Sequence, residues 1–263
     1  FLKCGRIFME KLSKQPLIEV IFEFHWFNKR GFPDPQYRFL IGRLYESLRD
    51  KFSKYEILPT ANIPPETLPH DVKIIQYRFK NKDYGWPAVQ LGPGILTVNM
   101  NENYDTWEKF KPVIEEVLAK FLQSYTEKEG LAIDKLILKY IDAFDFKKDT
   151  GDVLNYLKDK LHTTVELSFG NDERKNLLKQ TPKNLDIRLE YEVVEPKGFA
   201  GIRFLTVPLK GRDHLIMESY VVSDEIGEDA ELSYVSKWLD KAHNITDFIF
   251  SSLIRGSLME ELK

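Results

Sequence analysis

Two carboxylates and an imidazole share one face of an alternating segment, residues 17–27. The three residues are Glu19, Glu23 and His25, and the alternation predicts that they project from one side of a β-strand. A carboxylate beside a histidine shifts the imidazole pKa toward neutrality, which suits acid–base chemistry or a metal ion. Such a row is more often the polar face of an amphipathic strand, and the sequence favours that interpretation.

Amide side chains form a second group at the end of another alternating segment, residues 95–101. Asn99 and Asn101 fall on the same strand face, and Asn103 follows in a turn. Amides in this arrangement could recognise a polar ligand. They also serve routinely at strand ends and helix entries, so both interpretations stay open.

The third group is a short run of carboxylates made up of Asp142, Asp145, Asp149 and Asp152. Calcium-binding loops place oxygen ligands at alternate positions with a glycine at the sixth, and this spacing does not match. A strand end followed by a helix N-cap at Asp149 or Thr150 explains most of the run. Asp142 is the exception, because it falls on an apolar-leaning face where a carboxylate needs a hydrogen-bond partner or solvent.

The sequence lacks the common catalytic and phosphate-binding motifs. It contains no GxGxxG, no P-loop, no HExxH and no GxSxG, and its five histidines are not at metal-ligand spacing. Gly92-Pro93-Gly94 predicts a hairpin turn instead of a phosphate cradle. We therefore expect no cofactor and no metal ion, and the sequence favours a non-enzymatic protein.

Composition narrows the class of partner. The 263 residues carry 38 basic and 41 acidic side chains, whereas proteins whose main partner is nucleic acid usually have a basic excess. Cys4 is the single cysteine, which fits a reducing cytoplasm, and no apolar run reaches the roughly 20 residues that span a membrane. Residues 1–8 are expected to be a tag or a mis-assigned start, with Met9 as the natural first residue.

Hydrophobic periodicity predicts the elements that position these residues. In residues 9–130 we expect strands at 17–27, 72–80, 86–91 and 95–101 and helices at 36–52 and from 105 onward. In residues 131–263 we expect strands at 135–146, 163–169, 185–194, 199–209 and 215–222 and helices at 152–161 and 230–254. The predicted fold is α+β, with two tandem β-α-β(3–4)-α units in one pseudo-twofold body. Helices should cover one face of the antiparallel sheet or sheets.

One sheet face should then be open and mixed in charge. It is predicted to collect Glu19, Glu23, His25, Gln76, Arg78, Gln90, Asn99, Lys139, Arg188, Glu190, Arg203 and Glu218. This face is either simply solvated or a recognition surface for another protein. The first strands of the two units hold most of the unusual polar residues, so their junction is the place to look if they are neighbours. The candidate binding residues are Glu19, Glu23, His25, Asn99, Asn101, Lys139, Asp142 and Asp145.

Four stretches of the sequence, at residues 15–23, 90–99, 104–110 and 138–142, resemble a sporadically distributed, uncharacterised family of bacterial and archaeal proteins of about this length. The family typically begins with a Pro-Leu-x-Glu-Val-Ile strand, as here. Lys139 and Asp142 stand where the family usually has arginine and asparagine. The resemblance covers the first half well and the second half loosely, and it brings no established activity. The element order also resembles that of TATA-binding-protein-like folds.

The leading hypothesis is a binding protein that uses its open sheet face to hold a protein partner or a second copy of itself. The sporadic distribution implied by the family resemblance suits an accessory or defence-associated component. The alternative is a metal-dependent hydrolase or nuclease-like enzyme. In that case Glu19, Glu23, Asp142 and Asp145 should converge.

Overall fold

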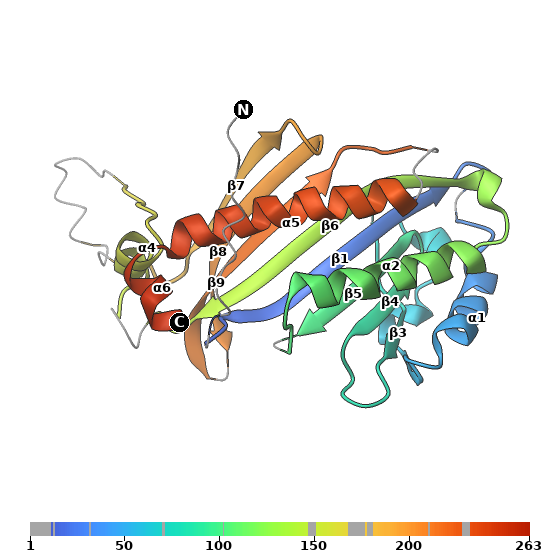
Figure 1. The fold of residues 1–263 in the computed structure, drawn as a ribbon, viewed down its shortest axis with the longest axis horizontal. Helices are drawn as coiled ribbons and strands as arrows, with labels where there is room; N and C mark the ends of the chain where they lie inside the picture. The colour runs from blue at the N-terminus through green and yellow to red at the C-terminus, as the bar shows by residue number, and fades with distance from the viewer. Residues whose placement is uncertain are drawn as a thin grey trace.

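The computed structural model describes residues 12, 14–31, 33–69, 72–101, 103–146, 151–167, 177, 181–209, 211–227 and 232–263. Within them, nine strands form one antiparallel sheet accompanied by five α-helices (Figure 1), so the predicted α+β class is confirmed. The strands are β1 (Leu17–Asn28), β2 (Lys54–Ile57), β3 (Tyr77–Lys80), β4 (Ala88–Gly92), β5 (Ile95–Asn101), β6 (Leu131–Phe144), β7 (Asp186–Val193), β8 (Gly198–Leu209) and β9 (Arg212–Ser223). The helices are α1 (Tyr37–Leu48), α2 (Trp107–Ser124), α4 (Val153–Lys160), α5 (Leu232–Ile254) and α6 (Ser257–Leu262), with short 3₁₀ segments η1 (Pro59–Asn62), η2 (Pro65–Thr67) and η3 (Lys128–Gly130).

The sheet is organised around two long central strands. Its order is β2-β3-β4-β5-β1-β6-β9-β8-β7, and every neighbouring pair is antiparallel. β1 and β6 pair from Leu17 opposite Asp142 to Asn28 opposite Leu131, with irregularities near each end of β1. The two strands that were predicted to hold most of the unusual polar residues are therefore hydrogen-bonded neighbours.

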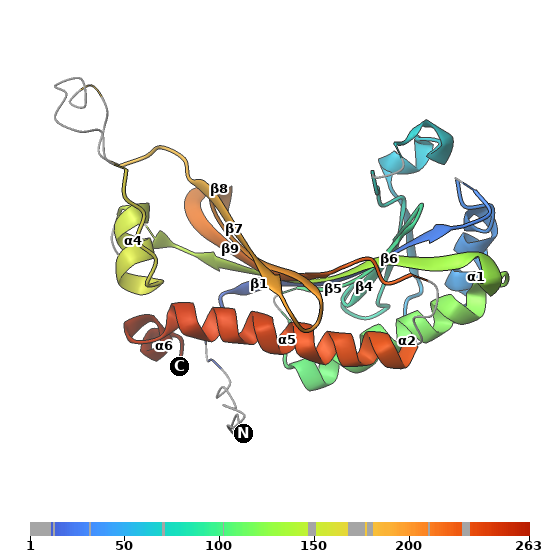
Figure 2. The ribbon, with the colours of Figure 1, turned by 90° about the horizontal axis from the view of Figure 1, so that it is seen from above.

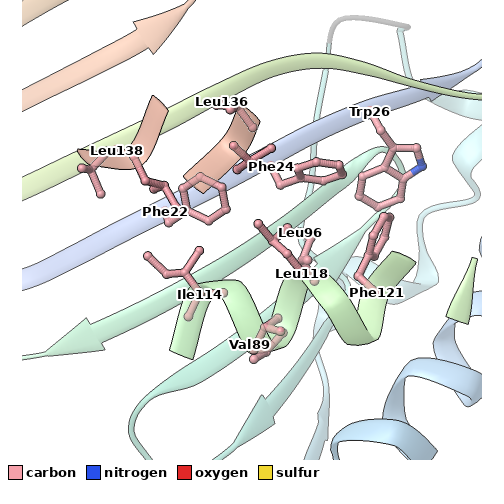
Figure 3. Packing of buried hydrophobic residues seen from close by; sticks show 14 of the residues in the cluster. Phe22, Phe24, Trp26, Val89, Leu96, Ile114, Leu118, Phe121, Leu136 and Leu138 are labelled. Atoms are coloured by element: carbon pink, nitrogen blue, oxygen red, sulfur yellow. The ribbon is translucent and has the colours of Figure 1, made fainter. Parts of the chain in front are cut away.

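Alternation along β1 decides which face is buried. Phe22, Phe24 and Trp26 are at most 1% exposed and point toward α2 (Figure 3). The ring of Trp26 lies 4.8 Å from that of Phe121 on α2, in an edge-to-face arrangement. Fully burying each such side chain contributes roughly 1.5–3 kcal/mol, so this face fixes the register of β1.

Helices α2 and α5 lie on the same side of the sheet, whereas η1 and η2 lie on the other (Figure 2). Trp238 and Leu239 of α5 join the cluster that contains Phe22 and Phe121. Helices α4 and α6 pack with the end of α5 in a second cluster, which also includes Phe204 of β8. The opposite face of the central strands is left without a helix from the described parts of the chain.

Several predicted elements need correction. The strand predicted at 72–80 begins only at Tyr77, and residues 163–167 of the strand predicted at 163–169 form no regular structure. Strand β2 and helix α6 were not predicted. The hairpin turn is confirmed, since Gly92 pairs with Ile95 and Gly94 has φ +71. None of the helices in the described ranges combines the length and apolar character that a membrane crossing requires.

Candidate functional site

The candidate site is the face of the sheet opposite α2 and α5. Residues directly opposite each other in antiparallel strands share a face, so the pairings determine its members. We call this surface the open face; it includes Glu19, Glu23, His25, Glu56, Arg78, Gln90, Thr97, Asn99, Lys139, Arg188, Glu190, Arg203, Glu218 and Tyr220. Every residue predicted for this face belongs to it except Gln76. That side chain precedes β3, is buried, and bonds to the Tyr37 hydroxyl and the Ile63 carbonyl.

A continuous line of side-chain hydrogen bonds crosses the open face from the centre of the sheet to one edge. We call it the β1–β2 network; it runs through Glu19, Asn99, Thr97, Gln90, Arg78 and Glu56. The Asn99 amide donates to Glu19 Oε1 at 2.8 Å and accepts from the Thr97 hydroxyl at 2.5 Å. Arg78 donates to Gln90 and to Glu56. Asn99 and Thr97 are almost fully buried, and these bonds satisfy them.

A second network lies on the other side of the β1–β6 junction and is centred on Tyr220. Its ring crosses β8 at Gly201, which directly faces Tyr220 in the ladder. The hydroxyl accepts from Arg188 Nε at 2.7 Å and donates to Glu190 Oε1 at 3.0 Å, both on β7. Burial and the neighbouring Glu190 raise the pKa of this hydroxyl, so it remains a donor at neutral pH. Lys139 Nζ lies 6.0 Å from the ring centroid, and this contact joins the Tyr220 network to β6.

Glu23 and His25 form a pair between the two networks, with Glu23 Oε2 2.7 Å from His25 Nε2. Burial alone would raise the pKa of Glu23, but the hydrogen bond and charge of His25, with Lys139 and Lys135, lower it below its ordinary value. Glu23 is therefore an ionised acceptor at neutral pH. His25 is 6% exposed, and its Nδ1 has no partner among the described residues. A cavity of about 320 Å³, lined by Val153 and other residues, includes none of the open-face side chains.

Three further candidate residues lie outside the two networks. Asn101 is on the open face, opposite Glu19, and its Oδ1 accepts a hydrogen bond from the Asn103 backbone at 3.2 Å, which stabilises a turn. Asp145 forms an ion pair with Arg212 at 3.5 Å. The prediction that Asp142 belongs to the site is wrong. Its side chain is 2% exposed and lies on the helix-covered face, opposite Met217. Burial raises its pKa to about 8.

The carboxylate run does not act as a unit. Asp152 caps α4 by accepting from the backbone of Leu154 and Asn155, whereas Asp149 lies outside the described residues. The helix cap predicted at Asp149 or Thr150 is therefore Asp152. Over the described part of the chain, no three histidine, cysteine or acidic residues are grouped as a metal ion would need.

Sequence reasoning missed three members of the site: Glu56, Thr97 and Tyr220. Glu56 lies on β2, a strand that the sequence did not predict. Thr97 lies two residues before Asn99 on the same strand, so period-two alternation alone could have assigned it to the open face. The signal for Tyr220 was Gly201, because a glycine within a strand often marks a place where another group approaches closely.

No family model and no curated protein matches the chain. The functional inference therefore depends on the open face itself.

Proposed function

We propose that this chain is a non-enzymatic binding protein whose open face recognises a protein partner. The observation that carries the proposal is the β1–β2 network, which crosses five strands on the side of the sheet opposite α2 and α5. Its groups are held by one another before any partner arrives, so binding them costs little side-chain ordering. Charges of both signs in fixed positions give specificity for a complementary protein surface.

The charge pattern favours a protein over a nucleic acid. Basic groups on the open face lie beside acidic ones: Arg78 and Lys80 both contact Glu56, and Arg203 contacts Asp186. Binding to a phosphate backbone depends on basic groups that neutralise phosphates and release counterions. Arginines and lysines already compensated by carboxylates serve that purpose poorly.

The geometry also favours binding over metal-dependent hydrolysis. The enzyme hypothesis needs Glu19, Glu23, Asp142 and Asp145 in one site. Strand pairing instead places Asp142 on the helix-covered face, with the backbone of the sheet between it and Glu23. Asp145 pairs with Arg212 beyond the end of β6. The carboxylates therefore lack a common centre at which to hold a metal ion.

We further propose that residues 9–130 and 131–263 are two copies of one unit, arranged like the TATA-binding-protein-like folds. Support comes from the sheet order, in which β1 and β6 are central and β5-β4-β3 and β9-β8-β7 extend outward from them. The helices that close the two units, α2 and α5, lie on the same side (Figure 2). The resemblance to a sporadically distributed family supports a cytoplasmic accessory or defence-associated role.

Affinity capture from the native host tests the proposed function. The wild-type chain is compared with a variant carrying Arg78→Ala and Arg188→Ala, which breaks both open-face networks. The matched control carries Arg49→Ala and Lys237→Ala, which remove two exposed charges from outside the open face. We expect a protein captured by the wild type and the control, and at least about tenfold depleted with the open-face variant.

Thermal unfolding establishes that all three proteins are folded before capture. Equal recovery of the captured protein with the open-face variant would contradict the proposal, as would the absence of any protein enriched by the wild type.

A further inference from the structure

The outer edge of β7 is a second interaction surface, at the margin of the open face. We propose that two copies of this chain pair antiparallel through β7, about a two-fold axis at Leu189, and so continue the sheet from one copy into the other. The inference does not depend on the proposed function.

Strand β7 ends the sheet with a regular row of unpaired backbone groups. It pairs with β8 from Asp186 to Val193 without a register shift, and its other edge meets no strand of the described chain. Thr206 N donates to the Leu185 carbonyl at 3.0 Å, so odd-numbered residues of this segment bond to β8. The N–H and C=O groups of Asp186, Arg188, Glu190 and Glu192 therefore point outward.

This edge carries charged side chains but lacks the other usual protections against pairing. β7 contains no proline, lysine or bulge over its eight residues, whereas β2 at the other end of the sheet has four residues and begins with Lys54. Leu189 and Tyr191 are 43% and 56% exposed, although they lie on the helix side of the sheet. An apolar row next to free backbone groups is a surface suited to another strand.

The side-chain pattern of β7 complements itself. With the axis at Leu189, Arg188 lies directly opposite the partner's Glu190, and Ile187 lies opposite the partner's Tyr191. Arg188 and Glu190 both direct backbone groups outward, so the hydrogen-bond pattern and the charge pairing require the same register. The outermost pair would place Asp186 near the partner's Glu192, but Arg203 already neutralises Asp186 through two bonds of 2.8 and 2.6 Å.

Sedimentation of the full chain tests the pairing. Wild type should be a dimer at high micromolar concentration, and Leu189→Lys should weaken self-association at least about tenfold by placing two ammonium groups on the axis. The matched control is Phe248→Lys on α5, which changes another exposed apolar side chain and should leave the dimer intact. A monomeric wild type, or a dimeric Leu189→Lys variant, would overturn the inference.

Disulfide trapping tests the register. In a Cys4→Ser background, Leu189→Cys should cross-link two chains under mild oxidation, because residues facing each other in a non-hydrogen-bonded pair have Cα atoms about 4.5 Å apart. Tyr191→Cys alone should not cross-link, but it should do so when mixed with Ile187→Cys. Equal cross-linking of Leu189→Cys and of Phe248→Cys on α5 would contradict an axis at Leu189.

Discussion

At the scale of single residues, the absence of a side chain at Gly201 permits the Tyr220 network. A Cβ atom at that position would lie 2.1 Å from Tyr220 Cζ, much closer than atoms can approach. The ring can cross β8 and reach Arg188 only because glycine leaves that space free. The backbone at Gly201 does not have a positive φ, so the requirement is steric.

Replacing Gly201 with alanine should therefore displace Tyr220 and destabilise the fold by about 1–3 kcal/mol, as overpacked sites do. The control is Gly42→Ala, at an exposed position of α1 where a Cβ meets nothing within 4 Å. That substitution should stabilise the helix by roughly 0.5–1 kcal/mol. Urea unfolding measures both free energies; a Gly201→Ala variant as stable as wild type would contradict the steric account.

Asp142 should make stability depend on pH. Burial raises its pKa from an ordinary 3.8 to about 8, so between these values the folded state keeps a proton that the unfolded chain has lost. The contribution of protonated Asp142 to stability is fully present below its unfolded-state pKa and falls as pH rises toward 8, by about 1.4 kcal/mol per pH unit.

Asp142→Asn cannot titrate and should lack this loss. Urea unfolding at pH 5 and pH 8 should show that the free energy of unfolding of the variant, relative to that of wild type, is greater at pH 8. Parallel pH profiles for the two proteins would show that Asp142 is ionised in the folded state.

At the scale of elements, Asp34 joins a strand to two helices. Its carboxylate accepts from Trp26 Nε1 on β1 at 2.9 Å and from the Tyr125 hydroxyl, just after α2, at 3.1 Å. It also accepts from the backbone N–H of Gln36, immediately before α1 begins. One buried carboxylate thus fixes the entry to α1 against the ends of two other elements.

Asp34→Ala should cost about 3 kcal/mol, because it leaves several buried donors without an acceptor. Asp50→Ala, at an exposed aspartate after α1, should change stability by less than about 0.5 kcal/mol. Differential scanning calorimetry of both variants checks the contrast. A similar, small effect of the two substitutions would mean that the Asp34 bonds contribute little.

The bounds of strands with strong alternation could be predicted from the sequence. The bounds of strands that depend on pairing with a neighbouring strand could not. Strand β5 has the predicted bounds, Ile95–Asn101, because its alternation is complete. Residues 72–75 looked equally strand-like, but β4 ends at the turn after Gly92 and offers them nothing to pair with. The four residues of β2 do alternate polar and apolar, but the segment is too short for that period to predict a strand.

The candidate site was predictable as a face but not as a network. Period-two alternation was enough to place Glu19, Asn99 and Arg78 on one surface. The bond between Glu19 and Asn99 joins residues 80 positions apart, so it depends on strand order and register. A carboxylate on an apolar strand made Asp142 a candidate binding residue. Its position two residues after Tyr140 already indicated the apolar face.

At the scale of the whole molecule, helices α2 and α5 and the polar networks lie on opposite sides of one sheet. The buried side supplies the core, in which Trp26 and Trp238 belong to the same cluster. The other side carries two networks, one on each side of the β1–β6 junction. A partner bound there would contact both halves of the chain at once.

Site-specific photo-cross-linking in the native host is the most direct test that the open face is the recognition surface. A photoreactive residue replaces Lys139 at the junction in one protein and exposed Lys237 on α5 in another. The account predicts a discrete cross-linked protein partner from position 139 and none from position 237. Cross-links to the same partner from position 237, with none from position 139, would contradict it.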